Sequence, residues 1–160
     1  MQSVRPSFDP VDTIIGSWAM RASSLPIWLS GLTYPPTYTF SVIRELPDRI
    51  AESLTYSTRG GQDVTVESVN RLIGGAFVSR GSGLALLSTS KWSISGLSDD
   101  GVVAIVRYEK TRLSAEGVNV LVREGHVRPS LRSEVASSTE QFGLSLEDFA
   151  SITWFDQTRE

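Results

Sequence analysis

The sequence predicts one antiparallel β-barrel built from an up-and-down meander, with a short helix before it and a helical segment after it. Three observations favour this fold class. A chain of 160 residues fits one domain. About eight short β-prone runs follow one another, separated by turn residues at the spacing typical of barrels and sandwiches. The hydrophobic spacing then becomes helical near the end of the chain.

The first element is a short helix over residues 9–16. Asp9 is a suitable N-cap, and Pro10 fits the first helical position because it has no backbone N–H to leave unpaired. Gly16 ends the helix. The barrel is then expected over residues 17–124, within a single domain covering residues 1–160.

Aromatic and β-branched residues define the expected strands, and Gly, Pro and Asp residues define the turns between them. The strands are residues 17–23, 37–45, 50–58, 63–71, 76–80, 84–95, 102–111 and 118–124. Breakers such as Pro26 and Pro35 forbid a regular interior strand over residues 25–36. Closing the meander into a barrel removes exposed strand edges, which would otherwise invite aggregation.

The last part, residues 129–155, is expected to be helical. Leu131, Val135, Ser138 and Phe142 recur at helical spacing, and Gly143 stands where a helix would end. A second start follows, because Ser145 is a cap residue with an acid, Asp148, three positions later.

Composition excludes several classes of function. The net charge is −3 and the basic residues are scattered, which argues against nucleic-acid binding. The chain has no cysteine and one histidine, His126, so we expect no metal site and no cofactor. Haem ligation by His126 is the alternative to an exposed loop histidine. No apolar run is long enough to span a membrane, and residues 1–10 lack the apolar core of a secretory signal, so we expect a cytoplasmic protein.

Gly16-Ser17-Trp18, directly after the short helix, resembles the Gly-X-Trp motif of the lipocalins and the wider calycin superfamily. The resemblance implies an eight-stranded lipocalin-like barrel whose Trp18 closes one end and is covered by an arginine of the last strand, for which Arg123 is the candidate. It also implies a hydrophobic small molecule as the partner. The chain lacks the cysteines of the extracellular lipocalins, and some intracellular or microbial barrels of this kind act as cyclases or isomerases.

Strand alternation assigns side chains to the barrel interior, because successive side chains point to opposite faces. The interior and ligand-binding candidates are Tyr38, Phe40, Tyr56, Trp92 and Tyr108, with Leu84 and Leu86 on the face of Trp92. A stripe of aromatic side chains can also be plain core. Glu52, Glu67 and the pair Arg107 and Glu109 are expected on the outer face.

Three hypotheses remain open. In the first, the barrel binds an apolar small molecule, and residues 25–36, with Trp28 and Tyr34, cover its mouth as a lid. In the second, the same cavity acts as a cofactor-free cyclase or isomerase, with Tyr108, Tyr56 and Lys110 as catalytic candidates. In the third, the barrel is filled and the protein has a structural or assembly role. An oligomer is compatible with each of them.

Overall fold

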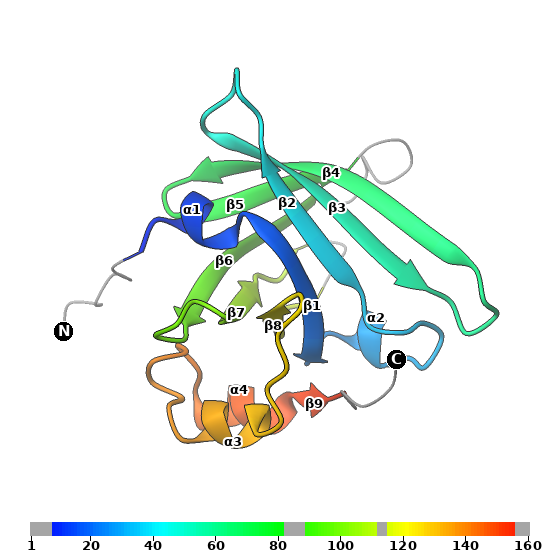
Figure 1. Ribbon diagram of the computed structural model, residues 1–160, viewed down its shortest axis with the longest axis vertical. Coiled ribbons are helices and arrows are strands. Elements are labelled where there is room, and N and C mark those ends of the chain that lie inside the picture. The colour runs from blue at the N-terminus through cyan, green and yellow to red at the C-terminus, as the bar shows by residue number, and fades with distance from the viewer. Residues whose placement is uncertain (1–7, 82–88, 112–114, 156–160) are drawn as a thin grey trace.

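The computed structural model describes residues 8–81, 89–111 and 115–155, and its elements are shown in Figure 1. In chain order they are α1 (Pro10–Ile14), β1 (Gly16–Ser23), α2 (Pro26–Leu29), β2 (Thr37–Val42), β3 (Arg49–Ser57), β4 (Asp63–Ile73), β5 (Ala76–Gly81), β6 (Thr89–Leu97), β7 (Val103–Tyr108), β8 (Gly117–Arg123), α3 (Leu131–Ala136), α4 (Leu146–Ser151) and β9 (Thr153–Trp154). Leu84 and Leu86 lie outside the described residues.

Strands β1 to β8 form the closed antiparallel up-and-down barrel that the sequence predicts. Each strand pairs with the next, and β1 closes the ring by pairing with both β8 and β2. The β1–β2 pairing ends at Ala19 and Thr37. Beyond this point β1 continues and pairs instead with the short β9, through Ala22 and Trp154.

Most strand boundaries agree with the prediction, and the exceptions follow from the turns. β4 runs on to Ile73, so the hairpin to β5 is formed by Gly74 and Gly75 alone. Both glycines have positive φ, 58° and 86°, as a two-residue hairpin requires. β2 and β7 end earlier than expected, at Val42 and Tyr108.

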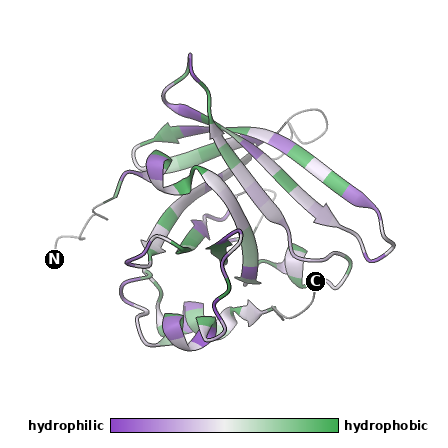
Figure 2. Ribbon diagram, viewed as in Figure 1, coloured by the Kyte–Doolittle hydropathy of each residue, from purple (hydrophilic) through white to green (hydrophobic). Residues whose placement is uncertain are grey.

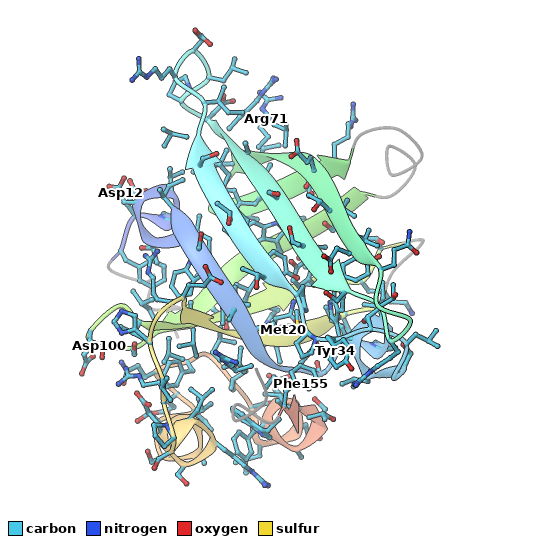
Figure 3. The ribbon with its side chains drawn as sticks, turned by 45° about the vertical axis from the view of Figure 1, so that its right-hand side comes forward. Asp12, Met20, Tyr34, Arg71, Asp100 and Phe155 are labelled. Atoms are coloured by element: carbon cyan, nitrogen blue, oxygen red, sulfur yellow. The ribbon has the colours of Figure 1, made fainter. Side chains whose placement is uncertain are left out.

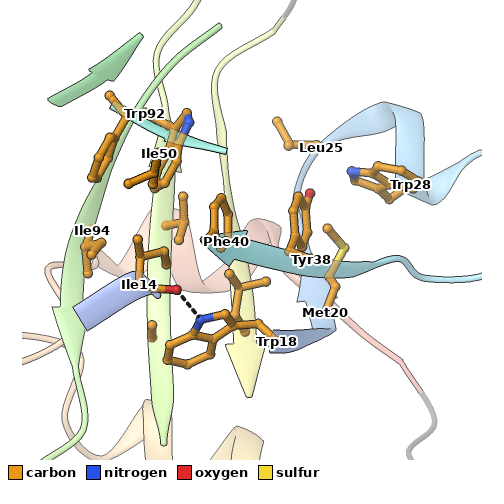
Figure 4. Close-up of a cluster of buried hydrophobic side chains, with 14 residues drawn as sticks. Ile14, Trp18, Met20, Leu25, Trp28, Tyr38, Phe40, Ile50, Trp92 and Ile94 are labelled. Carbon is orange, nitrogen blue, oxygen red and sulfur yellow. Dashed lines mark hydrogen bonds between the residues drawn. The ribbon is translucent and has the colours of Figure 1, made fainter. Parts of the chain in front are cut away.

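One end of the barrel is sealed by α1 and the motif that follows it. Asp9 caps α1 by accepting from the Val11 amide, as predicted. The Trp18 indole N–H donates to the Ile14 carbonyl over 2.9 Å (Figure 4). The Arg123 guanidinium lies 4.0 Å from the centre of the Trp18 ring, and this confirms the expected partner. We call this the closed end.

The C-terminal segment packs on the outside of the barrel, beside β7 and β8 (Figure 1). The predicted helical region contains two short helices, α3 and α4, joined by turns, and α3 ends at Ala136, earlier than the predicted end at Gly143. The predicted capping box is present, because Ser145 and Asp148 each accept a hydrogen bond from the other's backbone amide. No helix among the described residues is long and apolar enough to span a membrane.

A second, outer core lies between these helices and the barrel wall. Its buried members are Ala22, Val103, Ile105, Val118, Val120, Val122, Leu131, Val135, Phe142, Leu144 and Ile152. The inner core lies within the barrel and contains the aromatic side chains. β7 and β8 are therefore covered on both faces, whereas β3 and β4 are covered only on the inner face. Because the outer face of β4 is exposed to solvent, polar and apolar residues alternate along this strand (Figure 2).

Candidate ligand-binding site

The interior of the barrel is filled at the closed end. Trp18, Phe77 and Trp92 are at most 1% exposed, and Phe40 is 3% exposed. Trp92 stacks on Phe77 at a ring-centre distance of 4.4 Å and contacts Phe40 at 5.5 Å. This part of the barrel is a packed aromatic core (Figure 4).

Towards the other end, the inward-facing side chains of β3 and β4 are only partly buried. On β4, the inward-facing Leu72 near the closed end is partly buried and packs against the aromatic core, whereas Ile50 and Asn70, next towards the mouth, are fully buried. Beyond them every inward-facing position on these strands keeps accessible surface, and the set is Glu52, Leu54, Tyr56, Val64, Val66 and Ser68. We call the part of the barrel that these side chains line the open half, because they are accessible there.

A chain of hydrogen bonds connects the aromatic core to this open half. The Trp92 indole N–H donates to the Asn70 side-chain oxygen over 2.8 Å, and the Asn70 amide N–H₂ donates to a Glu52 carboxyl oxygen over 3.0 Å. Ser68, directly opposite Glu52 on β4, also donates to the carboxyl group. The indole thereby fixes which way the Asn70 amide points, and its donor faces Glu52.

Two tyrosines from opposite sides of the barrel meet beside Glu52. Tyr38 comes from β2 and Tyr108 from β7, and the two phenols lie close enough for each to shift the pKa of the other. Tyr38, Glu52, Asn70 and Tyr108, together with Ser68, form what we call the polar cluster. It is the base of the open half, with apolar side chains on either side.

Burial controls the acidity of this cluster. Desolvation raises the pKa of Glu52 above its ordinary value, and the hydrogen bonds from Asn70 and Ser68 oppose this rise. Desolvation and the nearby Glu52 raise the pKa of both Tyr38 and Tyr108, so the phenols stay neutral. The cluster therefore offers one carboxyl group and hydroxyl protons in a setting with little water.

All five aromatic residues that strand alternation places in the interior do lie on the inner side of the barrel wall. Tyr38, Phe40 and Trp92 are buried, and Tyr56 and Tyr108 are partly buried and pack against the same cluster. Phe40 and Trp92 belong mostly to the filled core, whereas Tyr56 and Tyr108 border the open half.

The connection between β1 and β2 extends across the barrel mouth. Trp28, in α2, is 9% exposed and contacts the Tyr56 ring edge-on at 5.5 Å. Tyr34 lies further along and is 42% exposed, with the Arg59 guanidinium 3.9 Å from its ring centre. Trp28 therefore faces the interior, whereas Tyr34 packs on the β3–β4 hairpin.

Lys110 lies beyond the end of β7 and is exposed. It borders an outer groove between the β7–β8 connection and α4, together with Glu109, Glu116 and Glu147. Its ammonium group is not among the side chains of the polar cluster.

Glu52 was expected on the outer face, and this expectation is wrong. It lies inward, directly opposite Phe40, while Glu67 is exposed as expected. The sequence does indicate the inward position of Glu52. It is separated from Leu54 and Tyr56 by an even number of positions, so its side chain points to the same face of the strand as theirs. Arg107 and Glu109 also do not pair with each other: Arg107 binds Asp148 at 2.8 Å, and Glu109 binds Lys91 at 3.3 Å.

A groove lies where β1 and β2 separate, and its lining includes the inward-facing Tyr56 as well as side chains of the outer surface. This groove has a volume of about 1060 Å³, and Met20, Tyr34 and Phe155 lie together along it (Figure 3). Arg21, Arg59 and several hydroxyl groups complete its wall. Among the described residues no group of three potential metal ligands is present, and His126 is exposed in a turn.

Comparison with known proteins establishes the fold. No family model matches the sequence, and no curated protein matches it. Among solved structures, the allergen Per a 4 from cockroaches superposes with a TM-score of 0.67 at 14% identity, covering 99% of this chain and 94% of its own. The tryptamine complex of the amine-binding protein of Rhodnius prolixus gives 0.62 at 12% identity, covering 92% and 82%. The bovine lipocalin allergen Bos d 2 gives 0.59 at 13% identity, covering 92% and 94%. The barrel is thus lipocalin-like, as the motif at Gly16-Ser17-Trp18 predicted.

Proposed function

We propose that the protein binds a small, largely apolar molecule in the open half of the barrel, with the polar group of that molecule at the polar cluster. The observation that carries this proposal is the gradient of burial along β3 and β4. Ile50 and Asn70 are 0% exposed, yet all inward-facing positions beyond them remain accessible.

The chemistry of the lining supports the same proposal. Small-molecule sites are mostly apolar with a few converging polar groups, which fix the orientation of the ligand. Leu54, Tyr56 and Val66 supply apolar surface here, and Glu52 and Tyr108 supply polar atoms at its base. The solved structure from Rhodnius prolixus, which holds tryptamine, has the same barrel fold.

A blocking substitution tests this location. Val66 faces the open half, opposite Leu54, whereas its neighbour Thr65 faces solvent. We expect V66W to weaken binding of the neutral fluorescent probe N-phenyl-1-naphthylamine by about tenfold or more, because the indole occupies its space. The matched variant T65W adds the same side chain outside and should bind as the wild type does.

Equal binding by V66W and the wild type would place the probe elsewhere and overturn the proposed location. Failure of the wild type to bind any apolar probe would favour the filled barrel with a structural role. Native mass spectrometry of protein purified from its own host then identifies the natural ligand as a co-purifying mass.

A second candidate function is cofactor-free cyclisation or isomerisation in the same space. Burial raises the pKa of Glu52, and a carboxyl group with a raised pKa stays protonated to a higher pH than an ordinary one, so it can donate a proton to a bound substrate there. Tyr108 and Tyr56 border the same space and could hold or polarise the substrate.

This candidate predicts that the molecule identified by mass spectrometry is converted to an isomer by the wild-type protein. Y108F and Y56F should slow that conversion without unfolding the barrel. Wild-type rates in both variants would remove the tyrosines from the mechanism, and an unchanged molecule would leave binding as the function.

A further inference from the structure

We infer that the ligand of the open half carries an organic ammonium group, which forms an ion pair with the Glu52 carboxylate inside the aromatic wall. This inference rests on the proposed binding function and names the chemical class of the ligand. It is argued from the surroundings of Glu52 alone.

Glu52 is an inward-facing, partly buried acid, and no residue in the described part of the chain supplies a cation to it. None of the ion pairs formed by the described residues includes it. A carboxylate is costly to bury unless a positive charge and hydrogen bonds compensate for its lost hydration. The hydrogen bonds are present, and a cationic ligand would supply the missing charge.

The neighbours of Glu52 are arranged for its ionised form. Asn70 and Ser68 both donate to the carboxyl group, and Trp92 holds the Asn70 amide in the orientation that makes this possible. Donors directed at a carboxyl group favour the carboxylate over the neutral acid. A site selected only for neutral ligands would not need them.

Several aromatic side chains lie on the inner face of the barrel near Glu52. Phe40 is directly opposite Glu52 on β2, and the rings of Tyr38 and Trp92 lie 5.9 and 5.5 Å from that of Phe40. Tyr108 follows at 6.3 Å from Trp92. Ring faces attract cations, and this attraction is strongest where water is excluded. A carboxylate among aromatic rings favours an ammonium group and repels an anionic ligand.

Binding should release a proton. The titratable groups that face Glu52 are Tyr38 of β2 and Tyr108 of β7, while β4 contributes the neutral Ser68 and Asn70. Burial raises the pKa of Glu52 in the empty site, and a bound ammonium group lowers it again. Affinity for an amine should therefore rise with pH until Glu52 is ionised, and fall when the amine loses its own proton, near pH 10.

The test compares three molecules of similar shape by titration calorimetry: tryptamine, its neutral counterpart tryptophol, and the anion indole-3-propionate. The wild type should bind tryptamine at least about tenfold more tightly than tryptophol, and indole-3-propionate most weakly. E52Q should lose the preference for tryptamine. E67Q removes the same charge from an exposed position on β4 and should keep it. In the wild type, the measured enthalpy should also depend on the ionisation enthalpy of the buffer.

The neutral probe N-phenyl-1-naphthylamine separates the two proposals. If the wild type binds this probe but does not prefer tryptamine to tryptophol, or if E52Q keeps the preference, the ammonium inference is overturned and binding stands. If neither the probe nor any of the three molecules binds, the proposed function itself is overturned. A cooperative urea-unfolding transition in E52Q shows that the variant is folded.

Discussion

At the scale of single residues, Arg123 joins separate parts of the closed end. Its guanidinium group donates to the carbonyls of Thr13 and Ile15, each over 2.6 Å, and covers the Trp18 ring. Gly16 has φ of 120°, and a Cβ there would lie 2.5 Å from the Arg123 Nη1 atom. The glycine, the tryptophan and the arginine are therefore one structural unit.

We expect R123A to lower the free energy of unfolding by about 3 kcal/mol, because two charge-assisted hydrogen bonds and the covered indole are lost. R123K keeps the charge but cannot hold both carbonyls while lying flat on the ring, so it should lose about half as much. Urea denaturation measures both values. A loss below about 1 kcal/mol in R123A would show that the closed end does not depend on this side chain.

Some residues of the candidate site could be predicted from the sequence, and others could not. Alternation placed Tyr38, Tyr56 and Tyr108 inward correctly, because strand geometry alone determines the face. The rule applies equally to Glu52, and the error came from treating a charged residue as an outer one. The contact between Tyr38 and Tyr108 was not predictable, because it joins strands that meet only across the closed barrel.

At the scale of elements, α4 is attached to the barrel by an ion pair. Arg107 of β7 binds Asp148 of α4 at 2.8 Å and also donates to the Gly143 carbonyl over 2.9 Å. Asp148 is at the same time the acid of the α4 capping box. Its pKa is lowered from 3.8 to about 2, first of all by the hydrogen bond from Arg107.

This lowered pKa gives a stability that is present above pH 4 and is lost as the pH falls towards 2, because protonation of Asp148 breaks the pair. We expect the wild type to lose about 1 kcal/mol more than D148N over this interval, after allowance for the partial exposure of the pair. Urea denaturation at pH 6, 4 and 2.5 measures the difference. Parallel curves for the two proteins would show that the pair contributes nothing.

The elements themselves were predictable where local signals define them. Asp9 and Pro10 start α1, and Ser145 with Asp148 starts α4. The early end of α3, at Ala136 instead of near Gly143, was not predictable, since it depends on packing against the barrel. A Cβ on Gly96 of β6 would overlap the Phe142 backbone, and the Ser95 hydroxyl donates to the Phe142 carbonyl over 2.9 Å. The segment after α3 therefore lies directly on β6, in a conformation fixed by long-range contacts.

At the scale of the whole molecule, the barrel has a rigid side and an accessible side. Val103–Ile105 and neighbouring residues of β7 are buried between the inner and outer cores, and so is most of β8. β3 and β4 have one covered face, and their inward side chains become more accessible towards the mouth. This division places the proposed site on the side of the barrel that can adapt to a ligand.

Hydrogen exchange should therefore be uneven around the barrel. Backbone amides exchange slowest where opening must disrupt a packed core, and fastest where few buried contacts hold the strand. We expect slow exchange in β7 and β8 and faster exchange in the mouth-side halves of β3 and β4. A bound ligand should slow exchange near Leu54 and Val66 and leave Val103 unchanged, since only the former face the open half. Mass spectrometry with and without N-phenyl-1-naphthylamine measures both effects. Equal protection of all strands without the probe would contradict the division into a rigid and an accessible side. If the probe slowed exchange only in α3 and α4, the ligand would bind outside the barrel.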